Sequence, residues 1–230
     1  MLLLWALACG PAASDSGRDP ADPTDTADTA GADTADTGPC PAGMVHVADF
    51  CIDAFEATVD GHLGDADQID AWPGTTTTAV ARSEQGVLPT VPLSWYQARG
   101  ACLNAGKHLC TVTEWQAACG EGALPWGDAP PPEEVCAVPA PDGSTAWDAL
   151  QPTGSLPDCR SPAGVYDQIG NAWEWADPEA LGPDTLPTTA KMGGAYYSGQ
   201  GNASCAVGPF TDHVPSFAGT IAARCCVAAR

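Results

Sequence analysis

Val165-Tyr-Asp-Gln-Ile-Gly-Asn-Ala-Trp-Glu-Trp175 is the stretch of sequence that decides the fold, because it combines a turn, oxygen-bearing side chains and two large aromatics. Asp167 and Glu174 offer carboxylate oxygens. The Gly-Asn pair between them suits a tight turn that would direct the carbonyls of Gly170 and Ala172 to one point. Hard oxygen ligands of this kind predict a calcium loop.

A second interpretation of the same stretch is a plain β-hairpin. Side chains alternate between the two faces of a strand, so Trp173 and Trp175 would enter a core and Glu174 between them would be solvated. The spacing alone leaves both interpretations open.

Five further motifs form a colinear series with this stretch. They are Pro92-Leu-Ser-Trp-Tyr-Gln-Ala98, Gly106-Lys-His-Leu-Cys-Thr-Val-Thr-Glu-Trp115, Pro125-Trp-Gly127, Gly193-Gly194 and Arg224-Cys225. Together the motifs resemble the formylglycine-generating-enzyme, or sulfatase-modifying-factor, family over roughly Cys40 to Cys226. The resemblance implies an α+β fold, namely the loop-rich, disulfide-stapled variant of the C-type lectin fold that this family adopts.

Length and composition suit one domain of this kind, which we expect over residues 40–230. With 230 residues and 44% hydrophobic content, the region after Pro39 is long enough to bury a core. The 25 glycines and 22 prolines favour many turns and few long helices. A formal net charge of -21 argues against nucleic acid and anionic membrane surfaces as direct partners, and it favours a cationic or neutral ligand.

The N-terminal segment Met1–Cys9 is an apolar run that ends in small residues and a cysteine. It resembles the end of a bacterial lipoprotein signal peptide, so we expect Cys9 to be lipidated. The protein would then be extracytoplasmic and anchored in the bacterial cell envelope, with the lipid as its only membrane contact. No basic residue precedes the run, which is shorter than a usual export signal and too short to span a bilayer. A cleaved secretory signal and a cytoplasmic location are the alternatives.

Residues 10–39 consist almost entirely of Asp, Thr, Ala, Pro, Gly and Ser. Such a tract cannot build a core, and we expect a disordered tether that spans on the order of 30 Å. Asp-Thr-Ala recurs at Asp25, Asp28 and Asp33. A calcium-binding aspartate repeat is the alternative, but the tract lacks the glycine spacing of known calcium loops.

The chain has 11 cysteines, of which ten remain for the folded region once Cys9 is set aside. An even number this large favours an oxidising compartment and up to five disulfides. Zinc is the rival explanation. However, no Cys-x-x-Cys motif occurs, and the Cys225-Cys226 pair has poor geometry for a shared tetrahedral site.

Two capping boxes predict two short helices. They pair Ser94 with Gln97 and Thr111 with Glu114. The predicted helices and the glycines at their C-caps are Trp95–Ala105 with Gly106 and Val112–Cys119 with Gly120.

The resemblance also implies two disulfides. In the family, cysteines near the ends of these two helices bond to the C-terminal segment, which implies the pairs Cys102–Cys225 and Cys119–Cys205. The sequence does not determine how the other six cysteines pair. Our working assignment for them is Cys40–Cys51, Cys136–Cys159 and Cys110–Cys226.

Catalytic activity is where this chain departs from the family. Formylglycine-generating enzymes oxidise a substrate cysteine with oxygen and a copper ion held by two cysteine thiolates, which are ligands suited to Cu(I). In the family these two thiolates follow shortly after a Gly-Gly-Ser motif. The corresponding positions after Gly193-Gly194 in this chain are Ser198 and about Ala203, and Ala195 replaces the serine of the motif. Cys205 matches a structural cysteine better. The resemblance therefore implies that copper-dependent oxidation is lost and that no catalytic residue is retained.

The calcium loop retains the family pattern. One family calcium is bound by an acidic or amide side chain, two backbone carbonyls and a glutamate, which map onto Asp167, Gly170, Ala172 and Glu174. The resemblance therefore implies one structural calcium. A second family calcium uses an asparagine near Cys136, where this chain has Ala137, so we do not expect that site.

Other catalytic chemistries find little support in the sequence. A non-haem iron site would need a pair of histidines, and no ligand pair is recognisable among His46, His62, His108 and His213. We expect His46 to lie on a strand with one face wet. Ser198 lacks a nucleophile-elbow motif.

We therefore expect a non-catalytic binding or accessory module for a peptide, a glycan or another envelope protein. The expected ligand face comprises Trp126, Tyr196, Tyr197, Ser198 and the acidic stretch 128–134. One alternative is a formylglycine-generating-type oxidase that acts on cysteine of exported proteins through a rearranged site, using Cys205 or an unpaired member of Cys225-Cys226. Another is a purely structural envelope component. Free thiols would distinguish the oxidase.

Overall fold

The computed structural model describes residues 38–61, 78–120, 124, 135–140, 142–144, 147–178, 188–198, 202–205, 212–213 and 219–230. The chain divides into two units, Met1–Ala35 and Asp36–Arg230, and all described residues belong to the second. The predicted signal segment with Cys9 and nearly all of the predicted tether lie outside the described residues.

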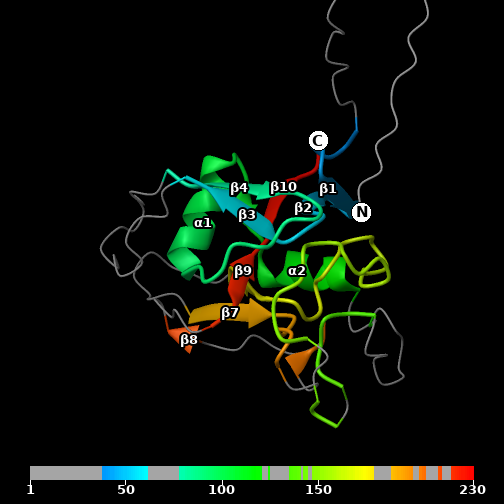
Figure 1. Cartoon of the computed structure of the whole chain (residues 1–230). Helices are drawn as coiled ribbons and strands as arrows, with labels where there is room; N and C mark the ends of the chain where they lie inside the picture. Colours follow the sequence, from blue (N-terminus) through cyan, green and yellow to red (C-terminus); the bar gives the residue numbers. More distant parts are fainter. Residues whose placement is uncertain are drawn as a thin grey trace, which may run out of the picture. The chain divides into compact units, whose positions relative to one another are not determined.

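The first sheet brings the two ends of the folded unit together (Figure 1). Its strands lie in the order β1-β2-β10-β5, and every neighbouring pair is antiparallel. The strands are β1 (Met44–Val47), β2 (Phe50–Asp53), β10 (Cys225–Ala228) and β5 (His108–Leu109). His46 in β1 is exposed, as expected of a strand residue on a wet face.

A second four-stranded sheet carries the Trp-Glu-Trp segment in its middle. Its order is β8-β7-β6-β9, in which β6 and β9 are parallel and the other pairs are antiparallel. The strands are β8 (Asp212–His213), β7 (Thr188–Met192), β6 (Trp173–Ala176) and β9 (Ile221–Ala223). Only Arg224 separates β9 from β10, so the C-terminal segment passes directly from one sheet to the other. A separate antiparallel pair comprises β3 (Ala57–Asp60) and β4 (Val80–Ser83).

Two helices occur among the described residues, and both begin at the predicted capping boxes. Helix α1 (Trp95–Asn104) ends one residue earlier than predicted, because Ala105 is its C-cap and Gly106 takes a positive φ of 72°. Helix α2 (Val112–Cys119) has the predicted bounds. Within the described part of the chain, neither helix is long and apolar enough to cross a membrane.

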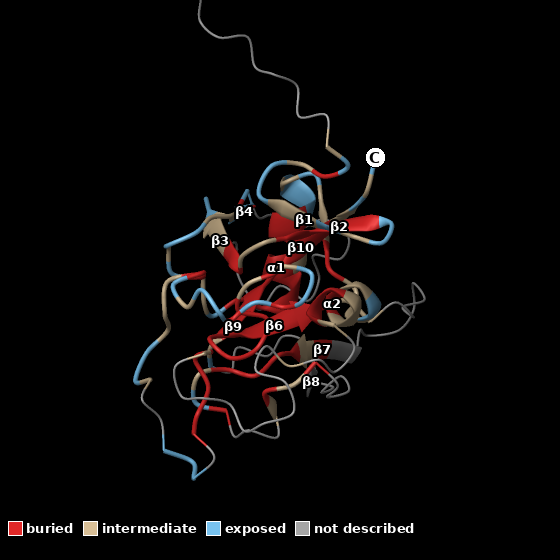
Figure 2. Cartoon of the chain, turned by 90° about the vertical axis from the view of Figure 1, so that its right-hand side faces the viewer, coloured by how far each residue is buried: buried red, intermediate tan, exposed pale blue. Residues whose placement is uncertain are grey.

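The largest fully buried side chains of the core are tryptophans. Buried residues continue through the inner strands and α1 (Figure 2). Trp95 and Trp175 are fully buried in one cluster, and Trp115 is fully buried in a second. The Nε1–H of Trp175 donates to the carbonyl of Leu93 at 2.7 Å, which satisfies its polar atom inside the core. A third cluster joins Phe50 and Ile52 of β2 to Ala118 of α2.

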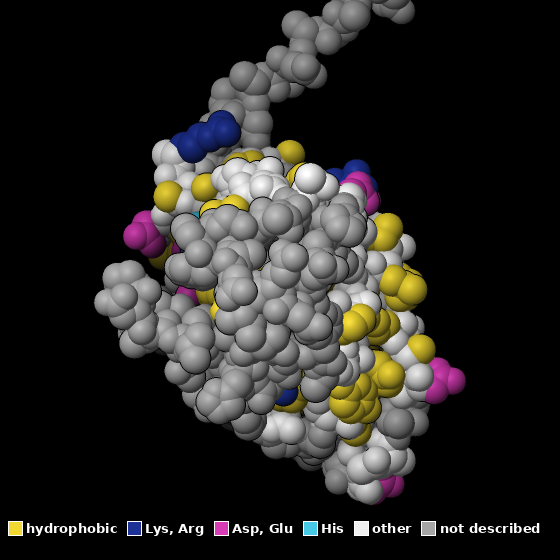
Figure 3. All heavy atoms as spheres, turned by 90° about the vertical axis from the view of Figure 1, so that its left-hand side faces the viewer, with side chains coloured by type: hydrophobic (Ala, Val, Ile, Leu, Met, Phe, Trp, Pro, Cys, Tyr) yellow, Lys and Arg dark blue, Asp and Glu magenta, His cyan; other side chains and the backbone are white. Residues whose placement is uncertain are grey.

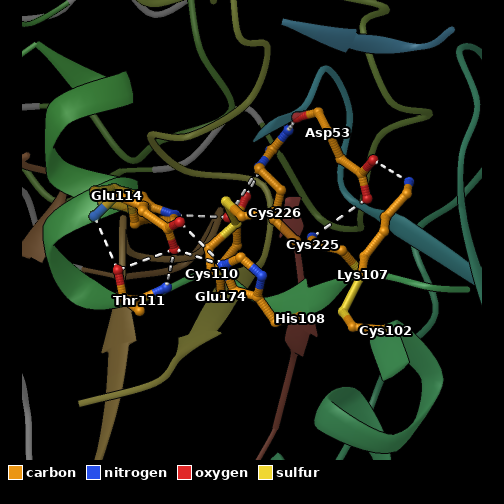
Figure 4. The surroundings of a disulfide bond; sticks show 12 residues. Asp53, Cys102, Lys107, His108, Cys110, Thr111, Glu114, Glu174, Cys225 and Cys226 are labelled. Carbon is orange, nitrogen blue, oxygen red and sulfur yellow. Dashed lines mark hydrogen bonds and ion pairs between the residues drawn. A yellow bond between two sulfur atoms is a disulfide. The ribbon is translucent and has the colours of Figure 1, made fainter. Parts of the chain in front are cut away.

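Five disulfides join all ten cysteines of the described residues. The pairs are Cys40–Cys51, Cys102–Cys225, Cys110–Cys226, Cys119–Cys205 and Cys136–Cys159. These are the two pairs that the family resemblance implied and the three of the working assignment. The adjacent cysteines of β10 bond in two directions, one to α1 and one to Cys110 (Figure 4). Disulfides in this number are consistent with an extracytoplasmic protein.

Candidate functional site

The predicted calcium loop has an unusual backbone. Asp167, Gly170 and Asn171 all adopt positive φ angles, of 57°, 82° and 53°. Glycine suits its position because a Cβ there would lie 2.3 Å from the carbonyl oxygen of Ala137. Asn and Asp are the other residue types that tolerate this region of φ. The sequence therefore provides the residue types that this tight loop requires.

The Asp167 residue of this loop is almost completely buried. Its Oδ2 accepts a hydrogen bond from the backbone N–H of Gly154 at 2.6 Å. Burial raises the pKa of Asp167 to about 6, although the Gly154 hydrogen bond and the charge of Arg224 oppose the shift.

Glu174 in β6 is fully buried, as is Trp175, and Trp173 is buried with 8% of its surface exposed. The hairpin interpretation, which left Glu174 in solvent, is therefore wrong. The physical reason is that β6 lies between β7 and β9 and has all four residues buried, so neither face of the strand meets water.

Arg224 is the ionic partner of Glu174. Its Nη2 donates to Oε1 at 2.6 Å and its Nε donates to Oε2 at 3.1 Å, while Trp115 Nε1 donates to Oε2 at 2.6 Å. The guanidinium also donates to the carbonyls of Asp53 and Tyr166 at 2.9 and 2.8 Å. The arginine was visible in the sequence only as part of a family motif, and its pairing with a glutamate 50 residues away was not predicted.

Glu56 is a site residue that the sequence analysis missed. It is fully buried and interacts electrostatically with Asp167 and Glu174. Burial, followed by these two charges, raises the pKa of Glu56 well above its ordinary value. No local motif marks Glu56, because its partners lie on a distant loop.

The buried charges of this region do not balance. Three carboxylates, from Glu56, Asp167 and Glu174, share the single guanidinium of Arg224, so two negative charges remain when all are ionised. A fourth buried carboxylate, Asp53, is matched by Lys107 at 2.5 Å (Figure 4). Uncompensated buried charge is costly, so a bound cation or bound protons must neutralise the excess.

The donor set fits calcium better than it fits a softer metal. Carboxylate and carbonyl oxygens are what Ca²⁺ prefers, and Glu174 Oε1 accepts a hydrogen bond from Arg224. Among the described residues, no three His, Cys, Asp or Glu side chains are placed to hold a metal ion together. Backbone carbonyls would therefore have to supply part of the ligand set, as the sequence pattern predicts.

The positions of the family's copper ligands are buried in this chain. Ser198 is nearly buried, and its Oγ accepts a hydrogen bond from the backbone N–H of Ala195 at 2.9 Å. Ala203 is also buried. Cys205, the nearest cysteine in sequence, is bonded to Cys119. The serine thus closes a local turn, and the described residues contain no thiolate that could hold copper.

The expected ligand face is described only in part. Trp126 and the acidic stretch 128–134 lie outside the described residues. Tyr196 and Tyr197 pack edge to face with their ring centroids 5.0 Å apart, and Tyr197 is 47% exposed. Hydrophobic side chains gather along one margin of the molecular face in Figure 3.

A cavity of about 660 Å³ opens elsewhere on the domain. None of the residues predicted for the ligand face or the calcium loop lines it. Its lining residues are Leu124, Val135, Asp158, Arg160, Ser161, Pro162 and Gly164.

The histidines do not converge in the described part of the chain. His108 contacts both carboxylate oxygens of Glu114 at 3.0 Å, and His46 lies exposed in β1. His62 lies outside the described residues, and only the backbone of His213 is described.

Comparison with known proteins places these observations in a family. The family described as Sulfatase-modifying factor enzyme 1-like domain matches residues 18–207. The chain is 34% identical over 96 residues to Inactive C-alpha-formylglycine-generating enzyme 2 of Bos taurus, covering 38% of this chain and 32% of that protein. It is 29% identical over 146 residues to Formylglycine-generating enzyme of Bos taurus, covering 54% and 38%.

The chain thus spans about a third of the length of these curated relatives. Among solved structures, Major Tropism Determinant M1 Variant superimposes with a TM-score of 0.50 at 16% identity, over 84% of this chain and 54% of that chain. This likeness supports the expected lectin-like fold. Because the family match covers most of the sequence, the chain belongs to the sulfatase-modifying-factor, or formylglycine-generating-enzyme, family.

Proposed function

We propose that this chain is a non-catalytic member of its family and serves as a binding or accessory module. The observation that carries the proposal is the state of the cysteines. All ten in the described residues form disulfides, while Ser198 and Ala203 occupy the positions matched to the copper ligands. The similarity to a relative named as inactive adds support.

The test is a formylglycine assay on the full-length protein. The oxidised protein is incubated with Cu(I), oxygen and a Cys-x-Pro-x-Arg peptide, and the conversion of cysteine is followed by mass spectrometry. Formylglycine-generating enzyme of Bos taurus serves as the positive control. We expect no conversion above the blank, whereas conversion by the folded protein would refute the proposal and favour the oxidase alternative.

A gain-of-function variant sharpens this test. Ser198→Cys combined with Ala203→Cys would place two thiols at the matched positions. We expect the double variant to compete for Cu(I) with a chromogenic chelator, and the unsubstituted protein not to compete. Equal competition by both proteins would point to copper ligands elsewhere in the chain.

We also propose that one calcium ion braces the loop around Asp167. Its ligands would be the Asp167 side chain, the carbonyls of Gly170 and Ala172, and Glu174. The excess of buried negative charge supports this assignment. After removal of calcium with a chelator, calorimetric titration should give one site, and Asp167→Ala should weaken it at least about tenfold. The exposed Asp49→Ala serves as the control and should leave affinity unchanged.

The proposal includes attachment to a bacterial envelope through Cys9, with a peptide, glycan or envelope protein as the ligand. The five disulfides support an oxidising compartment. Expression in a bacterial host should give a membrane-associated protein whose N-terminal peptide carries a lipid mass. Cys9→Ala should release the protein from the membrane fraction. Unmodified Cys9 in the membrane-associated protein would refute lipidation.

A further inference from the structure

Glu56 connects the start of the domain to the candidate calcium loop. It lies between β2 and β3, and its carboxylate is fully buried. Oε2 accepts a hydrogen bond from Nδ2 of Asn171 at 2.6 Å, and Oε1 accepts one from the backbone N–H of Ala172 at 3.1 Å. One side chain therefore holds two adjacent loop residues that lie 115 and 116 residues further along the chain.

Hydrogen bonds fix three consecutive peptide groups of this loop. The donors are the N–H groups of Asn171, Ala172 and Trp173, and the acceptors are Ala137 O, Glu56 Oε1 and Thr220 O. A trans peptide group points its carbonyl away from its N–H, so these bonds also set the directions of the Gly170 and Ala172 carbonyls. Glu56 holds the middle peptide group, which lies between the two carbonyls proposed as ligands.

The chemistry of this contact requires a carboxylate. Both atoms facing Glu56 are N–H donors, and an ionised carboxylate offers only acceptors. A glutamine amide would turn its own N–H₂ group toward one of these donors. Asn171 has little freedom to adjust, because its Oδ1 already accepts from the backbone N–H of Gln151 at 2.9 Å.

We propose that Glu56 is a positioning residue of the calcium loop. Its role is to orient the loop rather than to bind the cation, because its two oxygens accept from Asn171 Nδ2 and the Ala172 N–H. It holds the peptide group between the two carbonyl ligands. This inference rests on the calcium site proposed above. Groups that orient metal ligands commonly change metal affinity by 10–100-fold when they are removed.

The experiment compares calcium binding by the full-length protein and by Glu56→Gln, using calorimetry on chelator-treated samples. Glu84→Gln is the control, because that side chain is 43% exposed. We expect Glu56→Gln to keep one site with at least about tenfold weaker affinity, and Glu84→Gln to match the unsubstituted protein. Thermal melts of the same proteins without calcium measure separately how far each substitution destabilises the calcium-free fold.

The outcomes separate the two proposals. If the unsubstituted protein binds no calcium, the calcium site itself is refuted. If it binds calcium and Glu56→Gln binds equally well, only the role of Glu56 is refuted, even if the apo protein melts earlier. If Glu56→Gln does not fold, calcium binding by Asn171→Ser tests the role of Glu56 instead. This variant removes the Asn171 side-chain amide, which is one of the two donors to Glu56. An unchanged affinity in that variant would also overturn the proposal.

Discussion

Arg224 joins several buried segments of this protein. Its guanidinium is fully buried, forms a two-point ion pair with Glu174 and donates to the carbonyls of Asp53 and Tyr166. The planar guanidinium can make all of these contacts at once, which a lysine ammonium cannot. Its charge also offsets part of the buried carboxylate cluster.

Arg224→Lys should therefore lower the free energy of unfolding by about 3 kcal/mol or more, because breaking a buried ion pair leaves polar groups unpaired. Urea unfolding measures the loss. The exposed Arg82→Lys is the matched control and should change stability by less than about 1 kcal/mol. Equal effects from the two variants would show that the buried ion pair is not a principal source of stability.

A substitution at Gly170 tests how strongly the backbone geometry of the loop affects stability. Gly170→Ala must adopt a φ of 82° and also place a Cβ 2.3 Å from the Ala137 carbonyl oxygen. Gly86 is a matched control, with a φ of 81° and nothing within 4 Å of its added Cβ. We expect Gly86→Ala to cost about 1–2 kcal/mol from φ strain alone and Gly170→Ala to cost about 2–5 kcal/mol, as measured by urea unfolding. Equal losses would contradict the predicted clash.

At the scale of the element, helix α2 begins at a capping box that carries a charge. Glu114 Oε2 accepts from the backbone N–H of Thr111 at 2.8 Å, and both carboxylate oxygens contact His108. Burial raises the pKa of Glu114, but the hydrogen bonds from His108 and Thr111 outweigh it, so the net pKa is lowered. The first turn of α2 is therefore stabilised by an ionised side chain.

Glu114→Gln should destabilise the protein by about 1 kcal/mol at neutral pH. Because the folded-state pKa is below the unfolded one, this stabilisation is present above the unfolded glutamate pKa and is lost as pH falls through the folded value. The difference between the two proteins should therefore shrink in acid. Gln97→Ala, which removes the neutral partner of the α1 capping box, should show no such pH dependence. A pH-independent effect of Glu114→Gln would contradict this account.

At the scale of the whole molecule, disulfides hold distant segments of a loop-rich chain together. Cys102–Cys225 and Cys110–Cys226 fasten β10 on both sides and close loops of 123 and 116 residues. Arg224 immediately precedes these cysteines. The same two bonds therefore help to hold the guanidinium next to Glu174.

Removing Cys102–Cys225 by a double serine substitution should lower the free energy of unfolding by about 2–5 kcal/mol. The control is the same change at Cys136–Cys159, whose sequence separation is only 23. Because Cys110–Cys226 stays closed in this variant, Cys102–Cys225 closes only about ten further residues of chain in the unfolded state, so chain entropy predicts a loss no larger than that at Cys136–Cys159. Urea unfolding of both variants measures the order, and a loss at Cys102–Cys225 that is several kcal/mol larger would show that chain entropy is not its source.

A structural feature could be predicted from the sequence when its interacting residues lie close together along the chain. The capping boxes at Ser94 and Thr111 predicted both helices, because a capping box joins residues only three positions apart. The burial of Glu174 was not predictable from alternation, since a strand with both faces covered shows no wet side. The role of Glu56 had no local signal, because its partners are 115 and 116 residues away.

The sequence by itself determined the family, the two helices, and the residues of the candidate calcium loop. Each of these depends on residue types at fixed short spacings, which the chain carries in any conformation. Only the tertiary structure decided that Glu56, Asp167 and Glu174 share one guanidinium, and how the six cysteines outside the family pattern pair. Those features depend on packing, which brings carboxylates and sulfurs together from segments that no sequence spacing relates.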